Sequence, residues 1–208
     1  MNKFIRFSQV VLIVAGCALF IVPPSFFPSY YKPTLMGLVA LAYCFLIQLP
    51  VFIFRIPENA DASAMKEKVS SRGQLQAALS LGFLLSGLGS LGLWGLYRVG
   101  IPYDKIVHFT FSALLTVSGA YVFQAWYGWS LKKTAIVLAL VIGVSGIAWE
   151  FTEFFSDRWL HFGYFGQLFD GDSLFDIFTN LSGAGVGIIA WRQWSDNKLK
   201  HIGEDRGV

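Results

Sequence analysis

Long apolar segments alternate with short polar connections along the whole chain. The segments of mostly apolar residues lie at 7–22, 34–54, 75–97, 106–127, 134–154 and 176–191. Most of them approach the ~20 residues that an α-helix needs to cross the hydrocarbon core of a membrane. None shows the period-two alternation that is typical of a membrane β-barrel. The pattern predicts an all-α integral membrane protein, a bundle of six transmembrane helices that forms a single domain over residues 1–208.

The composition supports this prediction. Of the 208 residues, 55% are hydrophobic and 14% are charged, whereas soluble domains have about 25% charged residues. The formal net charge of +3 is small and scattered, so we expect membrane lipids as partners and no nucleic acid. Cys17 and Cys44 both lie in apolar segments, and we interpret them as packing residues rather than as a disulfide.

The first apolar segment permits two interpretations. Lys3 and Arg6 precede it, and residues 14–17 (VAGC) resemble the cleavage box of a lipoprotein signal peptide. The apolar run continues past Cys17, where a mature lipoprotein more often turns polar. We therefore favour an uncleaved helix that anchors the N-terminal end, with processing at Cys17 as the alternative.

Lysine and arginine residues are distributed unevenly between the two sides of such a bundle. If the N-terminus is cytoplasmic, twelve of the 16 Lys and Arg residues lie on the cytoplasmic side. Cytoplasmic loops of membrane proteins carry an excess of these residues. We therefore expect six helices with both termini in the cytoplasm.

With this orientation, polar residues that are unusual for membrane helices fall at the outer ends of the last three helices. They are Asp104, Lys105, His108 and Ser112 in the fourth, Glu150 and Glu153 in the fifth, and Asp172, Asp176 and Asn180 in the sixth. At about 100° per residue, positions three or four apart share one face of a helix. Ionised side chains are costly in lipid, so we expect these three faces to meet inside the bundle.

Glu150 is the residue of this set that a purely structural role explains least well. It ends its predicted helix, where the helix dipole disfavours a negative charge, and Glu153 adds a second one nearby. Two such carboxylates need a cation, a shared proton or a basic partner. By contrast, Asp104 and Asp176 have a simpler alternative as helix caps.

An imidazole among several carboxylates is typical of a site for a divalent metal ion, which polarises a phosphoryl group or activates water. We predict that His108, Glu150 and Asp176 are the catalytic groups or metal ligands of an outer-side pocket. In a metal-free version, His108 is a general base beside a protonated Glu150. The substrate-binding or supporting residues are then Asp104, Lys105, Glu153, Asp172 and Asn180.

Other functions stay open at this point, and the sequence does not decide whether the chain is an enzyme. Intramembrane acids and histidines also form proton relays, so a transporter or proton-coupled permease is one alternative. A non-catalytic membrane scaffold is another, with a structural ion-pair cluster that uses Lys105, Arg98 and Arg158.

About half of the chain resembles a known group of bacterial membrane proteins. The resemblance rests on residues 103–109 (YDKIVHF), on 149–150 (WE) with Glu153, and on 171–172 (GD) with Asp176, Asn180 and 183–184 (GA). These motifs are similar to the YjdF-type inner-membrane proteins and to the wider VanZ-like set, over residues 103–187.

The resemblance implies a place in the bacterial cytoplasmic (inner) membrane. VanZ-like proteins are linked to resistance to the glycopeptide teicoplanin, whereas YjdF-type proteins have no established activity. The spacing is closer to the YjdF type, because Glu153 stands where a glutamine would be more VanZ-like. The polar residues at the outer ends of the last three helices, rather than the resemblance, lead us to expect an outer-side pocket that acts on an envelope lipid or a lipid-linked substrate.

Overall fold

The computed structural model describes residues 2–26, 32–56, 61–159 and 172–204. All regular elements in this part of the chain are helical, which confirms the all-α prediction. They are α1 (Asn2–Ile21), the short 3-10 helix η1 (Pro24–Phe26), α2 (Pro33–Ile53), α3 (Ala62–Ser90), the 3-10 helix η2 (Leu93–Val99), α4 (Tyr103–Tyr127), α5 (Leu131–Arg158) and α6 (Asp172–Glu204).

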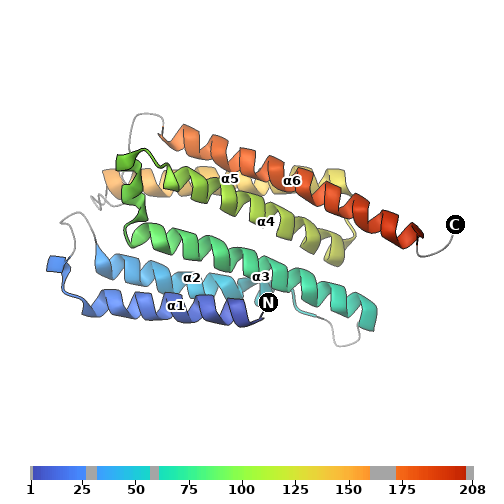
Figure 1. Cartoon of the computed structure of the whole chain (residues 1–208), viewed down its shortest axis with the longest axis horizontal. Coiled ribbons are helices and arrows are strands. Elements are labelled where there is room, and N and C mark those ends of the chain that lie inside the picture. Colours follow the sequence, from blue (N-terminus) through green and yellow to red (C-terminus); the bar gives the residue numbers. More distant parts are fainter. Residues whose placement is uncertain (1, 27–31, 57–60, 160–171, 205–208) are drawn as a thin grey trace.

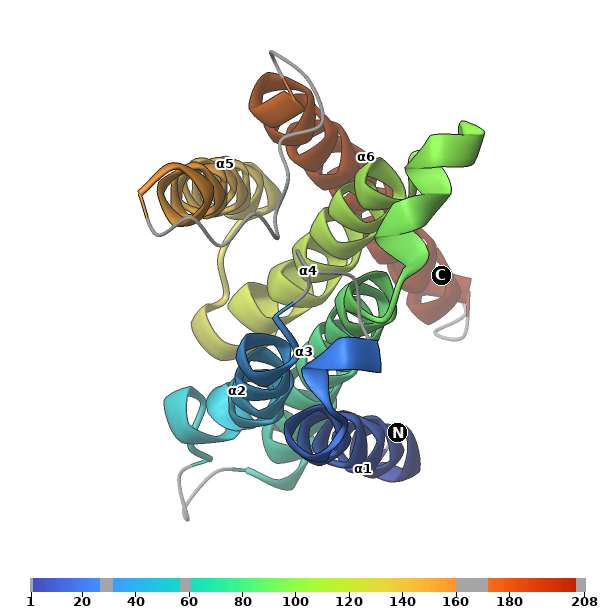
Figure 2. The same cartoon turned by 90° about the vertical axis from the view of Figure 1, so that its left-hand side faces the viewer.

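The long helices lie side by side along the long axis of the molecule and alternate in direction (Figure 1). Helices α1 and α2 pack on each other and on α3, while α5 and α6 pack on each other and on α4 (Figure 2). Helices α3 and α4 are in contact and join these two groups at the centre of the bundle. The beginnings of α4 and α6 and the end of α5 therefore lie at the same end of the bundle.

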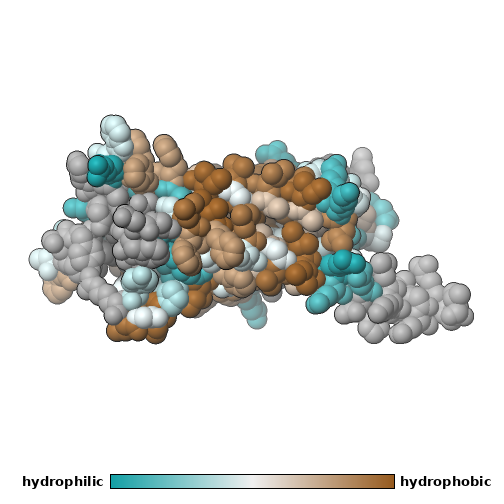
Figure 3. All heavy atoms as spheres, turned by 90° about the horizontal axis from the view of Figure 1, so that it is seen from above, coloured by the Kyte–Doolittle hydropathy of each residue, from teal (hydrophilic) through white to brown (hydrophobic). Residues whose placement is uncertain are grey.

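Five helices, α1, α2, α4, α5 and α6, are long and apolar enough to cross a membrane. On the face shown in Figure 3, hydrophobic residues dominate the middle and hydrophilic residues gather towards the ends. The prediction of a multi-pass membrane protein is confirmed at this level.

The bounds predicted for the third helix are wrong at both ends. Instead of spanning 75–97, α3 begins at Ala62 and ends at Ser90. It begins earlier because the polar connection, which has no proline after position 61, continues the same helix. It ends earlier because Gly92 has a φ of 129°, which breaks the helix before η2.

Helix α3 is not among the five apolar helices, and its environment explains its composition. It contacts α1, α2 and α4, so protein rather than lipid covers much of its surface. Ser71, Gln76 and Ser80 are all buried on it. The Gln76 amide donates to the Ile47 backbone oxygen at 3.2 Å, which satisfies a polar group inside the bundle.

Helices α1, α4, α5 and α6 begin before their predicted apolar segments, and α5 and α6 also end after them. The largest extension is in α6, predicted over 176–191, which continues through polar residues to Glu204. Similarly, α5 begins at Leu131, where the Ser130 hydroxyl accepts a hydrogen bond from the Lys133 backbone N–H. Hydropathy marks the part of a helix that suits a membrane, whereas the helix itself ends where its hydrogen bonding ends.

Candidate metal centre at one end of the bundle

Two glycines of α6 allow it to approach α4 closely. A Cβ atom added at Gly183 would lie 2.3 Å from the Phe109 backbone oxygen, and one at Gly187 would lie 2.7 Å from that of Ala113. Contacts this short exclude any side chain at either glycine, as in other close helix pairs of membrane proteins. The polar side chains one and two turns earlier on both helices are thereby brought within hydrogen-bonding distance.

The beginning of α4 is also fixed on its other side. The Tyr103 hydroxyl donates a 2.8 Å hydrogen bond to the Leu85 backbone oxygen of α3, and its ring contacts Trp94 edge-on. This anchor holds the first turn of α4 in place, with Asp104 and Lys105 immediately after it.

Lys105 lies at the centre of an ion-pair network that joins α4 to α6. Its ammonium group is 3.0 Å from Asp104 Oδ2, 2.5 Å from Asp172 Oδ1 and 2.7 Å from Asp176 Oδ1. Asp172 and Asp176 are buried, and Lys105 is mostly buried. Charged hydrogen bonds in such surroundings are stronger than those of exposed pairs.

His108 faces two of the same carboxylates. Its Nε2 atom is 3.3 Å from Asp104 Oδ1 and 3.8 Å from Asp176 Oδ1. Its other ring nitrogen, Nδ1, is 3.2 Å from Asn180 Oδ1. Because a carbonyl oxygen only accepts hydrogen bonds, this contact assigns the donor role to Nδ1 and directs Nε2 towards the carboxylates.

Asn180 is held in place by a hydrogen bond from α4. The Ser112 hydroxyl donates a 2.8 Å hydrogen bond to Asn180 Oδ1, and both residues are buried. A Cβ at Gly146 of α5 would lie 3.0 Å from Asn180 Nδ2, so the amide fills the space that this glycine leaves. Asn180 thus connects α4, α5 and α6 and orients the imidazole of His108.

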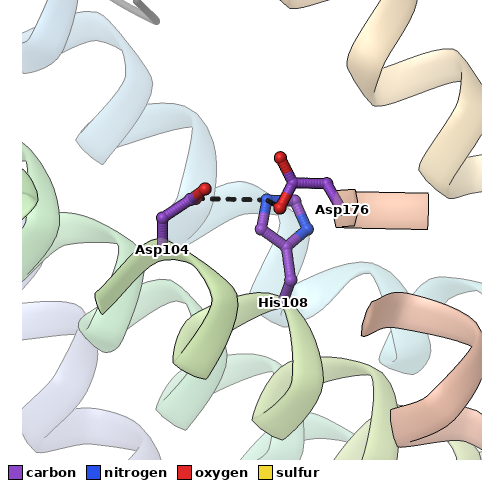
Figure 4. Close-up of side chains that lie close together, drawn as sticks. All are labelled: Asp104, His108 and Asp176. Carbon is purple, nitrogen blue, oxygen red and sulfur yellow. Dashed lines mark ion pairs between the residues drawn. The ribbon is translucent and has the colours of Figure 1, made fainter. Parts of the chain in front are cut away.

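Asp104, His108 and Asp176 form a group with the spacing that a metal ion requires. One ligand atom from each residue lies within 4.8 Å of the other two. Asp104 and His108 share a face of α4, and Asp176 approaches them from α6 (Figure 4). A nitrogen with two carboxylate oxygens is a common donor set for divalent ions such as Mn²⁺ or Zn²⁺.

Glu150 lies buried beside this group on α5. Its side chain is 5% exposed, and its Oε1 atom has no hydrogen-bond partner among the described residues. Ser173 of α6 makes a hydrogen bond to the Glu150 carboxyl group, and the charges of Asp176 and His108 act on it. An unpaired buried carboxylate oxygen is costly, so this atom points to a partner that the described residues do not supply.

Glu153 adds to the negative charge of the site. It is half-buried, and the charges of Glu150, His108, Asp104 and Asp176 all act on it. Within the described residues, the cluster holds five carboxyl groups against one lysine and one histidine, which leaves room for a further cation or for shared protons.

The sequence-predicted site residues therefore lie together at one end of α4, α5 and α6. The compact set of potential ligands, however, contains Asp104 together with His108 and Asp176, while Glu150 lies beside it. Lys105, which the sequence predicts as a supporting residue, contacts three carboxylates and lies at the centre of the cluster.

One contributor was missed by the sequence analysis. Ser173 contacts Glu150, and the available signal was its position next to Asp172 in the first turn of α6. Among the basic residues considered for a structural network, Arg158 is exposed, and the side chain of Arg98 lies outside the described part of the chain. Gly171, one of the residues that carry the family resemblance, also lies outside it.

A comparison of the chain with protein-family models, curated proteins and solved structures finds no match.

Proposed function

We propose that this chain is a multi-pass protein of the bacterial cytoplasmic membrane that binds a divalent cation at the outer end of α4 and α6. With this ion it acts on the phosphoryl group of an envelope lipid or a lipid-linked substrate. The observation that carries the proposal is the group Asp104, His108 and Asp176, whose ligand atoms lie within 4.8 Å of one another.

The surroundings of this group favour a role beyond a simple ion pair. Glu150 supplies a buried carboxylate oxygen that lacks a partner among the described residues. An ion held by Asp104, His108 and Asp176 would supply Lewis-acid polarisation of the phosphoryl group, and Glu150 would be the group beside it that accepts or supplies a proton. Asp104 and Asp176 neutralise the ion, and Asn180 keeps the imidazole of His108 in position.

A lipid substrate is favoured by the apolar surface directly around the site. Phe151, the neighbour of Glu150, is 67% exposed, and Phe175, the neighbour of Asp176, is 59% exposed. In a membrane these rings would face the acyl chains, which places lipid beside the ends of α5 and α6 that carry the polar group.

The proposed topology has six membrane crossings, with α3 as the least apolar one, and both termini in the cytoplasm. Its support is the excess of Lys and Arg on that side. At the end of the bundle away from the cluster, Lys133 lies 4.1 Å from the ring centroid of Trp129, and Lys68 lies 5.3 Å from that of Trp126. Aromatic and basic residues together are typical of a membrane interface. The resemblance to YjdF-type proteins agrees with this location.

The first test is cation binding by the purified protein in detergent. We expect Mn²⁺ or Zn²⁺ to bind, as measured by calorimetry and by elemental analysis after dialysis. The variants Asp176→Asn and His108→Ala should weaken binding at least about tenfold, since each removes one of few ligands. Asp196→Asn is the matched control, because Asp196 lies on α6 in an exposed pair with Arg192. If no cation binds to the folded protein, the proposal is wrong.

The second test addresses the substrate. Lipids and cell-wall precursors are compared in a strain that lacks the gene, complemented by the native chain or by Glu150→Gln. We expect a phosphorylated lipid species to accumulate in the deletion strain and in the Glu150→Gln strain. Identical lipid profiles in all strains would contradict the enzymatic part of the proposal.

A structural ion-pair cluster is the second candidate, and the contacts of Lys105 with three carboxylates favour it. In this case His108→Ala and Glu150→Gln lower thermal stability, whereas added cations have no effect on the native chain. A proton-coupled permease has less support, because the carboxylates of the cluster lie in the first turns of α4 and α6 and the last turns of α5 and not along the middle of these helices. Proton flux in liposomes that disappears in Glu150→Gln would favour it.

A further inference from the structure

The same carboxylate oxygen faces both Lys105 and the candidate metal ligands. Asp176 Oδ1 is 2.7 Å from Lys105 Nζ and 3.8 Å from His108 Nε2. Asp104 instead uses both of its oxygens, with Oδ2 at 3.0 Å from Lys105 Nζ and Oδ1 at 3.3 Å from His108 Nε2. At Asp176 the lysine therefore occupies an acceptor position that a bound ion would also use.

A metal ion and the ammonium group would be close neighbours with charges of the same sign. Oxygen ligands lie about 2.0–2.6 Å from divalent ions. An ion on Asp176 Oδ1 would thus lie within about 5 Å of the present Lys105 Nζ position, where the two positive charges repel each other. Binding of the ion and full contact of Lys105 with Asp176 oppose each other.

Asp172 offers Lys105 a contact that does not compete with a bound metal ion. Its Oδ1 atom is 2.5 Å from Lys105 Nζ, the shortest of the three contacts. Asp172 is buried and does not belong to the group of close ligand atoms. The flexible stem of a lysine side chain permits a small shift from Asp176 towards Asp172.

We propose that Lys105 is a built-in competitor of the divalent cation, which neutralises Asp104 and Asp176 when no ion is bound and is held by Asp172 when the ion binds. This inference rests on the proposed function, because it concerns the regulation of the same site. It is supported independently by Glu150, whose buried Oε1 atom has no partner among the described residues, so that Lys105 alone does not satisfy the cluster.

The experiment compares Mn²⁺ affinity in purified native chain, Lys105→Met, Lys105→Arg and Asp172→Asn. Lys105→Met keeps the length of the side chain and removes the competing charge, so its affinity should rise by about tenfold or more. Lys105→Arg keeps the charge and should not show this increase. Asp172→Asn removes the alternative partner of Lys105 and should weaken binding.

Helical circular dichroism and elution as a single species establish that each variant folds, and Lys105→Gln replaces Lys105→Met if the latter does not. Unchanged or weaker binding in a folded Lys105→Met, with an ion bound by the native chain, overturns the inference and leaves the proposed metal site standing. If Lys105→Met binds Mn²⁺ and the native chain does not, the inference is supported. The proposal that the native chain is a metal-dependent enzyme is then wrong. If neither binds Mn²⁺, both proposals are wrong.

Discussion

Gly183 of α6 lies directly against the backbone oxygen of Phe109 of α4, where an added Cβ atom would be only 2.3 Å from that oxygen. This contact is one turn from Asn180 and next to His108 in the α4 sequence. The separation of the two helices here sets the distances of Asp176 on α6 from the imidazole and from Asp104 on α4. Gly183 supplies no metal-ligating atom itself, yet it therefore controls the geometry of the candidate site.

The first prediction concerns this contact. Gly183→Ala should lower the free energy of unfolding by about 1–3 kcal/mol, since the methyl group forces α4 and α6 apart. It should also weaken Mn²⁺ binding, because the ligands lie on both helices. Thermal unfolding in detergent and calorimetry measure the two effects.

The control for this prediction lies two residues away. Gly185 is on the same helix, and a Cβ atom there would meet nothing within 4 Å. Gly185→Ala should leave Mn²⁺ affinity unchanged and should not lower stability, since alanine is the better helix former. Equal effects of the two substitutions would show that the Gly183 contact is not special.

A second prediction concerns Asn180, which acts on the site through His108. Asn180→Leu removes the oxygen that faces His108 Nδ1 and accepts from the Ser112 hydroxyl. The loss of two buried hydrogen bonds should cost about 1–3 kcal/mol of stability. Mn²⁺ affinity should fall as well, because the imidazole is no longer oriented. Asn180→Gln, which keeps an amide, should recover part of the affinity if orientation is the cause.

The control for Asn180 is Thr179→Val. The Thr179 hydroxyl donates to the Phe175 backbone oxygen of its own helix at 2.7 Å. Its removal should change stability by less than about 1 kcal/mol and leave Mn²⁺ affinity unchanged. An Asn180→Leu variant that loses stability but binds Mn²⁺ as the native chain does would contradict the orienting role.

Glu150 is the basis of a third prediction, because its two oxygens differ in their surroundings. The carboxyl group contacts Ser173, while Oε1 has no partner among the described residues. Glu150→Gln should therefore keep or raise thermal stability, by up to about 2 kcal/mol, since it removes a buried charge near other carboxylates. The same substitution should abolish the proposed lipid reaction.

The opposite result is informative for Glu150. A clear loss of stability in Glu150→Gln, with no effect on the lipid profile, would identify the residue as part of a structural network. Ser173→Ala serves as a comparison, since it removes the hydrogen bond and leaves the carboxyl group in place.

The fold was largely accessible from the sequence because membrane helices are marked by hydropathy. For α2, the segment predicted over 34–54 differs from Pro33–Ile53 by one residue at each end. Helix α3 was misplaced because it is covered by other helices, and such a helix tolerates buried polar residues such as Gln76 and Ser80. Its end depends on the backbone conformation of Gly92, which a hydropathy pattern does not show.

The site could be predicted in part from the sequence, for a related reason. Charged residues at the ends of apolar helices are rare, so Glu150, His108 and Asp176 stood out, and helical spacing indicated that they face inward. Spacing within one helix does not give the distances between helices. Those between α4 and α6 depend on Gly183 and Gly187, which bring Asp176 within 4.8 Å of Asp104 and His108, while Glu150 on α5 stays outside this group.

The final prediction tests the orientation of the bundle through the two ends of α5. Lys132 and Trp159 are both exposed, at the beginning of this helix and directly after its end. In a background with Cys17→Ala and Cys44→Ser, a membrane-impermeant maleimide should label Trp159→Cys in intact spheroplasts. It should label Lys132→Cys only after the membrane is permeabilised, because the proposed topology places the basic end of this helix in the cytoplasm.

This experiment also decides on which side the carboxylate cluster works. Glu150 and Glu153 lie on the last turns of α5 before Trp159, so the side that labels Trp159→Cys is the side of the cluster. The reverse labelling pattern would place the cluster at the cytoplasmic face. It would then exclude an outer-leaflet substrate, while cation binding by Asp104, His108 and Asp176 would be unaffected, since that depends only on their mutual distances.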